Sequence, residues 1–304
     1  MQTAEALTRS LTADIVAGRL KPGDRLPAVR GLALRLACAP GTVARSYAAL
    51  RAAHLVEGTP RSSLRVTVDG RIRAVSRQQP ALRLAGSDDP ALDLLLVACA
   101  GQVEVVPGER GSVHGIEQLT RGTADAATLH LFHPDHGTHN ADFVRGILGD
   151  NSLTMVHLWR REQVCVLPPG NPLGIGGVAE LAGRRLAWRG PGSGSRLLLE
   201  RLLASAGVVA EPTRGVRADS HRGVAIAVVT GAADAGLAVR AAAEAVGADW
   251  LPVTVEPFEL AIRTQALDRA RPLLAALTEP AFRAQVDALG GYDLSNSGDQ
   301  RAVP

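Results

Sequence analysis

The chain has 304 residues and a formal net charge of +3, a length that allows two domains with a sizeable core. Residues 1–80 carry 13 Lys and Arg against 5 Asp and Glu, whereas the rest of the chain carries 20 against 25. A basic head on a mildly acidic body predicts that the head meets a polyanion. No apolar run approaches a membrane span and the three cysteines lie far apart, so we expect a cytoplasmic protein without disulfides and without membrane contact.

Residues 1–70 predict a small helical domain that ends in a strand. Residues 3–17 carry leucine and isoleucine at helical spacing, and a second helix is expected to open at Pro27. After a tight turn, Thr42 leads a third helix, in which apolar residues at i, i+4 and i+7 form one buried stripe. Residues 64–68 alternate like a strand, and polar residues follow as a linker over 71–81.

This stretch resembles the GntR-type winged helix-turn-helix. The residues that carry the resemblance are Gly18 to Arg30, Leu32, Ala33, Gly41 to Arg45, Tyr47 and Leu50. The resemblance implies that the domain binds a double-stranded DNA operator, as a homodimer because such operators pair two half-sites. The DNA contacts expected from the family pattern and from exposed arginines are Arg30, Gly41, Thr42, Arg45, Arg61 and Arg65. The alternative is a small helical protein-interaction module.

From residue 82 strands and helices alternate, which predicts an α/β body. Two successive βα sets indicate two lobes around a cleft. Lobe I is expected at about 82–165 and 260–293, lobe II at about 170–258, and a polar, frayed tail at 294–304. Four separate strands are predicted where the lobes meet, at 153–159, 163–167, 250–255 and 258–263. Ligands of open α/β sheets bind at the carboxyl ends of strands, against helix N-termini.

The strongest site signal in the body is the loop Gly190–Ser195, which precedes a helix with Arg196 in its first turn. Backbone N–H groups, hydroxyls, the helix N-terminus and an arginine together form an anion cradle. The alternative is a plain turn whose serines cap the helix. Three more helices are expected to open with serine. The candidate ligand residues of these loops are Ser87, Asp88, Ser112, Ser193, Gly194, Ser195, Arg196 and His221. Asp88 opposes a purely anionic ligand unless it turns away to cap its own helix.

Residues 82–293 resemble the periplasmic-binding-protein-like domain that is found fused to helix-turn-helix domains and to molybdopterin-biosynthesis proteins. The resemblance rests on Gly86–Asp89, Gly111, Ser112, Gly115, His130, Leu131, Asn140, Pro169–Pro172, Gly192–Arg196, His221, Ala225, Gly231, Ala233–Gly236 and Gly290–Tyr292. It implies a type II sensing domain, in a family associated with molybdate or tungstate, and hence an oxyanion sensor; it also adds His130 to the ligand residues. From the donors in the loops we expect the ligand to be an oxyanion or a small carboxylate. No cofactor is expected.

Two other kinds of site are weighed against this one. His130, His133, His136 and His139 recur every three residues and invite a zinc site, but Pro134 and Gly137 break any helix that would align them. No catalytic motif is present, and Lys21, the only lysine, lies in the head, so the body has none to bind pyridoxal phosphate. Glu256 is a weaker cleft candidate, expected at the surface.

The sequence therefore predicts a one-component transcription regulator that senses a small anionic effector, and not an enzyme. The alternatives are an enzyme or metal-handling protein of molybdenum-cofactor assembly, and a ligand-storage protein.

Overall fold

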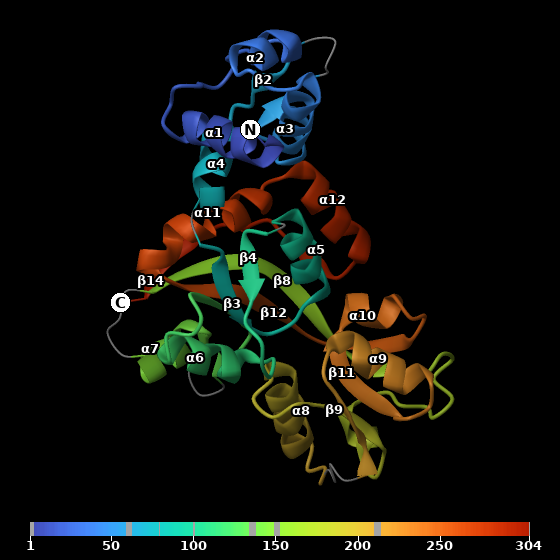
Figure 1. Cartoon of the computed structure of the whole chain (residues 1–304). Coiled ribbons are helices and arrows are strands. Elements are labelled where there is room, and N and C mark those ends of the chain that lie inside the picture. Colours follow the sequence, from blue (N-terminus) through green and yellow to red (C-terminus); the bar gives the residue numbers. More distant parts are fainter. Residues whose placement is uncertain are drawn as a thin grey trace. The chain divides into compact units, whose positions relative to one another are not determined.

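A computed structural model of the chain describes residues 3–58, 63–78, 80–99, 101–133, 138–148, 153–209 and 214–303. The chain divides into two compact units, which we call the head (1–80) and the body (81–304) (Figure 1). The predicted order of a helical head and an α/β body is confirmed. Each unit is described by itself.

The head is built from short helices and a small two-stranded sheet. Its elements are α1 (Ala4–Val16), α2 (Val29–Arg35), α3 (Pro40–Ala52), β1 (Val56–Glu57), β2 (Arg65–Val66) and α4 (Gly70–Gln78). The stripe predicted on the third helix is buried, with Val43 and Leu50 fully inaccessible. The second helix begins two residues later than Pro27, because the backbone of Ala28 is extended, and the carbonyl of Pro27 accepts from the Tyr47 hydroxyl at 2.7 Å.

The body begins with lobe I, in which parallel strands alternate with helices. Its elements are β3 (Leu82–Gly86), α5 (Pro90–Ala98), β4 (Val103–Val105), α6 (Ser112–Thr120), β5 (Ala126–Leu129), β6 (Phe132–His133), β7 (Thr138–His139) and α7 (Ala141–Leu148). Strand β3 pairs with β4 on one side and with β5 on the other, both in parallel. The strand β8 (Leu153–Leu167) then leads from this lobe into the next.

Lobe II repeats the pattern, and the chain then returns to lobe I. Lobe II holds η1 (Val178–Leu181), β9 (Leu186–Arg189), α8 (Gly194–Ser205), β10 (Val216–Ala218), α9 (His221–Val229), β11 (Ala235–Val239) and α10 (Arg240–Glu244). The strand β12 (Asp249–Arg263) runs back to lobe I. The remaining elements are η3 (Thr264–Ala266), α11 (Leu267–Ala276), α12 (Pro280–Leu289), β13 (Tyr292–Asp293) and β14 (Gln300–Val303).

Two long antiparallel strands join the lobes, where four separate strands were predicted. Among the described residues ten strands form one sheet, with the path β10-β9-β11-β8-β12-β5-β3-β4. Strands β8 and β12 each run for 15 residues and pair with each other along almost their whole length. The polar residues 160–162 and Glu256–Pro257, which suggest breaks in the sequence, lie mid-strand where the two lobes meet, with a register shift beside them. These two strands form the hinge of the body.

Both faces of the sheet are covered, because side chains along each strand alternate between two cores. In lobe I, Leu84 packs with α5, α11 and α12, whereas the next residue, Ala85, packs with α6 and α7 (Figure 1). In lobe II, Val164 packs with α9 and α10, and Cys165 packs with α8. This layering brings the N-termini of α6, α8 and α9 to the region between the lobes.

The expected frayed tail is in part an ordered strand. Residues 300–303 form β14, which pairs antiparallel with the first residues of β8. Arg301 makes a bidentate ion pair with Glu259 of β12, at 2.6 and 2.9 Å. The same carboxylate accepts from the Asn140 amide at 2.9 Å. The polar sequence of the tail is explained by this pairing at an edge of the sheet.

Candidate functional site

The head exposes one face of α3 to solvent. Gly41 and Arg45 are exposed, as is Arg30 at the start of α2, whereas the side chain of Thr42 is buried. We therefore expect Thr42 to contact DNA through its backbone, at the positive N-terminus of α3, and not through its hydroxyl. Ser46, on the next turn of α3, is fully buried, and its hydroxyl lies 3.0 Å from that of Thr8.

The wing of the head is only partly described. Arg65 lies on β2 and is exposed, and its guanidinium donates to the carbonyl of Gly23 at 2.8 Å. Arg61 lies outside the described residues. The described part of the wing therefore presents Arg65 to solvent. Contact between this arginine and a DNA phosphate stays a prediction.

In the body, the two neighbouring aspartates at the start of α5 do different things. Asp89 caps the helix, accepting from the Ala91 N–H at 2.7 Å. Asp88 points across to lobe II instead, where it accepts from the Arg189 guanidinium and, at 3.1 Å, from the backbone N–H of His221. A carboxylate of the protein thus occupies the N-terminus of α9. Burial disfavours its charge, but the interactions with His221 and Arg189 hold the pKa of Asp88 below its ordinary value.

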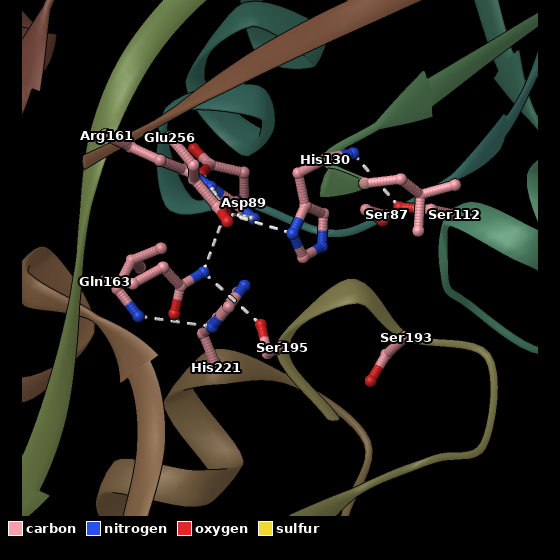
Figure 2. A network of polar contacts seen from close by, with 12 residues as sticks. Ser87, Asp89, Ser112, His130, Arg161, Gln163, Ser193, Ser195, His221 and Glu256 are labelled. Carbon is pink, nitrogen blue, oxygen red and sulfur yellow. Dashed lines mark hydrogen bonds and ion pairs between the residues drawn. The ribbon is translucent and has the colours of Figure 1, made fainter. Parts of the chain in front are cut away.

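A second charged group lies at the hinge (Figure 2). Arg161 of β8 is completely buried and donates to Asp89 at 2.6 Å and to Oε1 of Glu256, on β12, at 3.0 Å. The same Oε1 accepts from Gln163 at 2.9 Å and lies 3.0 Å from Nδ1 of His130. Glu256, expected at the surface, is therefore buried. Burial opposes its charge, yet His130, Arg161 and Gln163 lower the pKa of Glu256 below its ordinary range, so it is ionised at neutral pH.

The predicted serines come together, although not as one cradle. The hydroxyls of Ser87 and Ser112 lie 2.9 Å apart, and Ser112 also accepts from the His130 N–H at 3.1 Å. Ser193 caps its own helix by accepting from the Arg196 N–H, at 3.3 Å. Ser195 accepts from Gln163 at 3.3 Å. These hydroxyls line the region between the lobes, but their hydrogen bonds are already made within the protein.

Arg196 points away from the lobe boundary. Its guanidinium pairs with Glu200 one turn further along α8, at 2.8 Å, and lies over the ring of Trp188, 5.3 Å from its centre. The two arginines that do reach the boundary, Arg161 and Arg189, were missed by the sequence analysis. Each is a charged residue in an otherwise buried strand, which is the signal that could have found them.

Three buried polar atoms near the boundary between the lobes have no hydrogen bond among the described residues. Val239 donates to Nδ1 of His221 at 3.2 Å, and burial lowers the pKa of His221 well below its ordinary value. The ring is therefore neutral, with its proton on Nε2. His221 Nε2, Arg189 Nε and Gln163 Oε1 are buried and have no hydrogen-bond partner among the described residues. Two donors and one acceptor are thus available here.

A cavity of about 380 Å³ opens beside this region. His130 and Leu131 of lobe I bound it on one side, Gly194 and Leu198 of α8 on the other, and Glu256 lies at the hinge. The lobes touch at its edge: a Cβ added to Gly194 would come within 2.4 Å of the His130 carbonyl. The volume is within the usual size of small-molecule sites.

The structure does not test the zinc alternative. His136 lies outside the described residues, as do the side chains of His133 and His139. Within the part of the chain that is described, no three His, Cys, Asp or Glu side chains are grouped as a metal site requires.

Two family models match the chain. Residues 3–66 match the family of bacterial regulatory proteins named gntR, and residues 96–279 match the PBP superfamily domain, over more than half of the chain. The chain belongs to the PBP superfamily. A GntR DNA-binding head joined to a PBP-like binding domain is the composition of a ligand-sensing transcription regulator and not of an enzyme. None of the described helices has the length and apolar character needed to cross a membrane.

Individual proteins are similar to this chain over about 70% of its length. The chain is 26% identical over 226 residues to the Bacillus subtilis protein YvgK, which covers 72% of this chain and 73% of that protein. Its fold is similar to that of a tungstate ABC transporter structure from Geobacter sulfurreducens, with 18% identity, a TM-score of 0.47, and coverage of 68% and 98%. It is also similar to PhnD1 of Prochlorococcus marinus in complex with methylphosphonate, with 15% identity, a TM-score of 0.47, and coverage of 73% and 92%.

Proposed function

We propose that the protein is a one-component regulator of the bacterial cytoplasm whose head binds an operator as a homodimer and whose body binds a small effector with an anionic group. The anionic character of the effector is inferred from two buried donors, His221 Nε2 and Arg189 Nε, which have no acceptor among the described residues. Neither residue lines the cavity, but His130 does, and its ring lies 6.3 Å from that of His221. Buried donors in native proteins are normally paired, so we place the acceptor group of the ligand on this side of the cavity.

The hinge supports a coupling between effector and DNA. Ion pairs and hydrogen bonds link the lobes directly, among them the contact of Asp88 with Arg189 and the backbone bond from Val113 to Gly192, 3.2 Å long. An effector that contacts both lobes binds the closed arrangement better than an open one and shifts the population toward it. The effector can then change the operator affinity by no more than the ratio of its own affinities for the closed and the open arrangement.

The size of the cavity favours a small carboxylate over an inorganic oxyanion as the effector. A volume of about 380 Å³ is that of a pocket for an organic molecule, and leucine and valine side chains form part of its wall. A tetrahedral oxyanion has no apolar part to place against them.

The proposal is tested in two steps with the full-length chain. Duplexes selected from a random library are titrated with the protein by fluorescence anisotropy at two salt concentrations. The same titration is then repeated with molybdate, tungstate, sulfate and a set of C3–C9 carboxylates. We expect sequence-selective binding that weakens with salt, and one carboxylate that changes the operator affinity at least fivefold. Selective DNA binding that no anion alters would leave only the DNA half of the proposal.

A further inference from the structure

At the hinge, two carboxylates share one arginine. Arg161 is shared by two carboxylates, Asp89 and Glu256, and both ion pairs are short and buried, at 2.6 and 2.9 Å. Of the other arginines nearby, Arg189 is engaged by Asp88, and Arg201 lines the same cavity as Glu256. Burial raises the pKa of Asp89 and lowers that of His130. Burial also opposes the charge of Glu256, but His130 and Arg161 lower the pKa of Glu256, so Glu256 is the carboxylate of this group that keeps its charge.

The carboxylate of Glu256 borders the cavity, and only one of its oxygens is engaged by the protein. The contacts of Glu256 with Arg161, Gln163 and His130 all fall on Oε1, as the dashed lines in Figure 2 show. No hydrogen bond to Oε2 occurs among the described residues. The side chain of Glu256 keeps 11% of its surface accessible, and Glu256 lines the cavity. An ionised carboxylate with one saturated oxygen and one open oxygen attracts a cationic donor, and a low dielectric strengthens that attraction.

The remaining wall of the cavity suits an apolar body with an anionic end. Leu131, Leu198 and Val255 provide an apolar surface, and Arg201 of α8 also lines the space. Gly194 is the first residue of α8, where backbone N–H groups have no acceptor within the helix. His221 does not line the cavity, but its ring, which carries a donor without a partner among the described residues, lies 6.3 Å from that of His130, which does. The N-terminus of α8 and the carboxylate of Glu256 border the same cavity.

We propose that the effector is a zwitterion: an organic amino carboxylate whose ammonium group binds Oε2 of Glu256, whose carboxylate meets the donors of lobe II, and whose apolar side chain lies against Leu198 and Val255. This inference rests on the proposed function and narrows its effector class. It excludes molybdate and tungstate as effectors, since neither offers a cationic group to Glu256.

The test uses three matched probes with the full-length protein: L-phenylalanine, 3-phenylpropanoate, which lacks the amine, and 2-phenylethylamine, which lacks the carboxylate. The same comparison is made with L-leucine, 4-methylpentanoate and 3-methylbutylamine, and with molybdate and sulfate alone. Affinities are measured by isothermal titration calorimetry and checked by thermal shift. We expect at least one amino acid to bind tenfold or more tightly than both of its truncated analogues.

Glu256→Gln keeps the shape and removes the charge. We expect this variant to lose the preference for the amine, so that the amino acid binds at least tenfold more weakly while the affinity for the matched carboxylate changes less than threefold. Because the substitution also removes a partner of Arg161, its fold is checked by circular dichroism. Leu198→Trp fills the cavity and leaves the charged residues in place. We expect this variant to bind all the organic probes more weakly, by a similar factor for each.

The outcomes separate the two proposals. Carboxylates that bind as tightly as their amino acids, or a Glu256→Gln variant with unchanged ligand preference, overturn the zwitterion and leave the anionic effector standing. Molybdate or sulfate binding more tightly than every organic probe also overturns it. Binding of the amine alone, with the carboxylate end contributing nothing, contradicts the anionic effector. If no probe binds, neither proposal holds.

Discussion

Asp88 of lobe I and Arg189 of lobe II form an ion pair across the cleft, in which both side chains are at least nine-tenths buried. The pair also fixes the start of α9, because the second oxygen of Asp88 accepts from the backbone of His221. The protein thus holds part of its lobe boundary with a carboxylate of its own, at a helix N-terminus where an external anion was expected.

We expect Asp88→Asn to lower the free energy of unfolding by about 3 kcal/mol, since it leaves the Arg189 guanidinium buried with a neutral partner. Urea denaturation at pH 7 measures this change. Hydrogen exchange of the peptide that contains His221 should also become faster, because its N–H loses a charged acceptor. The control is Asp268→Asn, which breaks an exposed pair with Arg271 and should change stability by less than about 1 kcal/mol. Equal effects of the two substitutions would contradict the structural role of Asp88.

The close approach of α8 to lobe I gives a second prediction. A Cβ at Gly194 would lie 2.4 Å from the carbonyl oxygen of His130 and 2.6 Å from its ring. Gly194→Ala should therefore force the lobes apart or displace the ring, at a cost of about 1–3 kcal/mol, and weaken effector binding more than it weakens DNA binding. Gly176→Ala is the matched control, as no atom lies within 4 Å of its added Cβ and its φ is not positive. Thermal unfolding and calorimetric titration compare the two variants.

The sequence predicted the layers of the body correctly because apolar residues alternate along its buried strands. It failed at the hinge, where Arg161 and Glu256 suggest turns between short strands. Charged residues are rare inside strands, but here they satisfy each other across β8 and β12, and this long-range pairing overrides the local preference. The sequence could not reveal the pairing, since 95 residues separate the two partners.

The two aspartates show which part of the site was readable. Asp89 precedes Pro90, the first residue of α5, and an aspartate followed by proline is a strong sign of a helix start. The sequence analysis instead considered Asp88 as the cap; in the structure Asp89 caps α5, and Asp88 turns to lobe II. Its partner Arg189 lies 101 residues away, so only the fold could identify it.

The tail strand gives a prediction about pH. Burial disfavours the charge of Glu259, but the contact with His157, 3.9 Å away, and hydrogen bonds from Arg301 and Asn140 lower its pKa to about 2. A carboxylate with a lowered pKa stabilises the fold above its unfolded pKa, near 4.5, and this stabilisation is lost as the pH falls from there toward 2. Arg301→Gln should cost about 1 kcal/mol at pH 7, because the half-exposed guanidinium is screened by solvent, and the difference from the unaltered protein should shrink below pH 4. Denaturation curves from pH 2 to 7 measure it; a difference that grows toward low pH would contradict the assignment.

The last prediction concerns the head. Arg45 is exposed on α3, next to the helix N-terminus at Gly41 that we expect to meet DNA. If Arg45 contacts a phosphate, Arg45→Ala should weaken binding to all duplexes by a similar factor of about ten and reduce the slope of log affinity against log salt by about one. If it contacts a base instead, the loss should be confined to the selected operator and the salt slope should change less.

Arg271→Ala, which removes an exposed arginine of the body, controls for the change in net charge and should leave both the affinity and the slope unaltered. Fluorescence anisotropy with a selected and a scrambled duplex, at three salt concentrations, distinguishes these outcomes. If Arg45→Ala binds DNA with the same affinity and salt slope as Arg271→Ala, the prediction that this part of α3 contacts DNA is wrong.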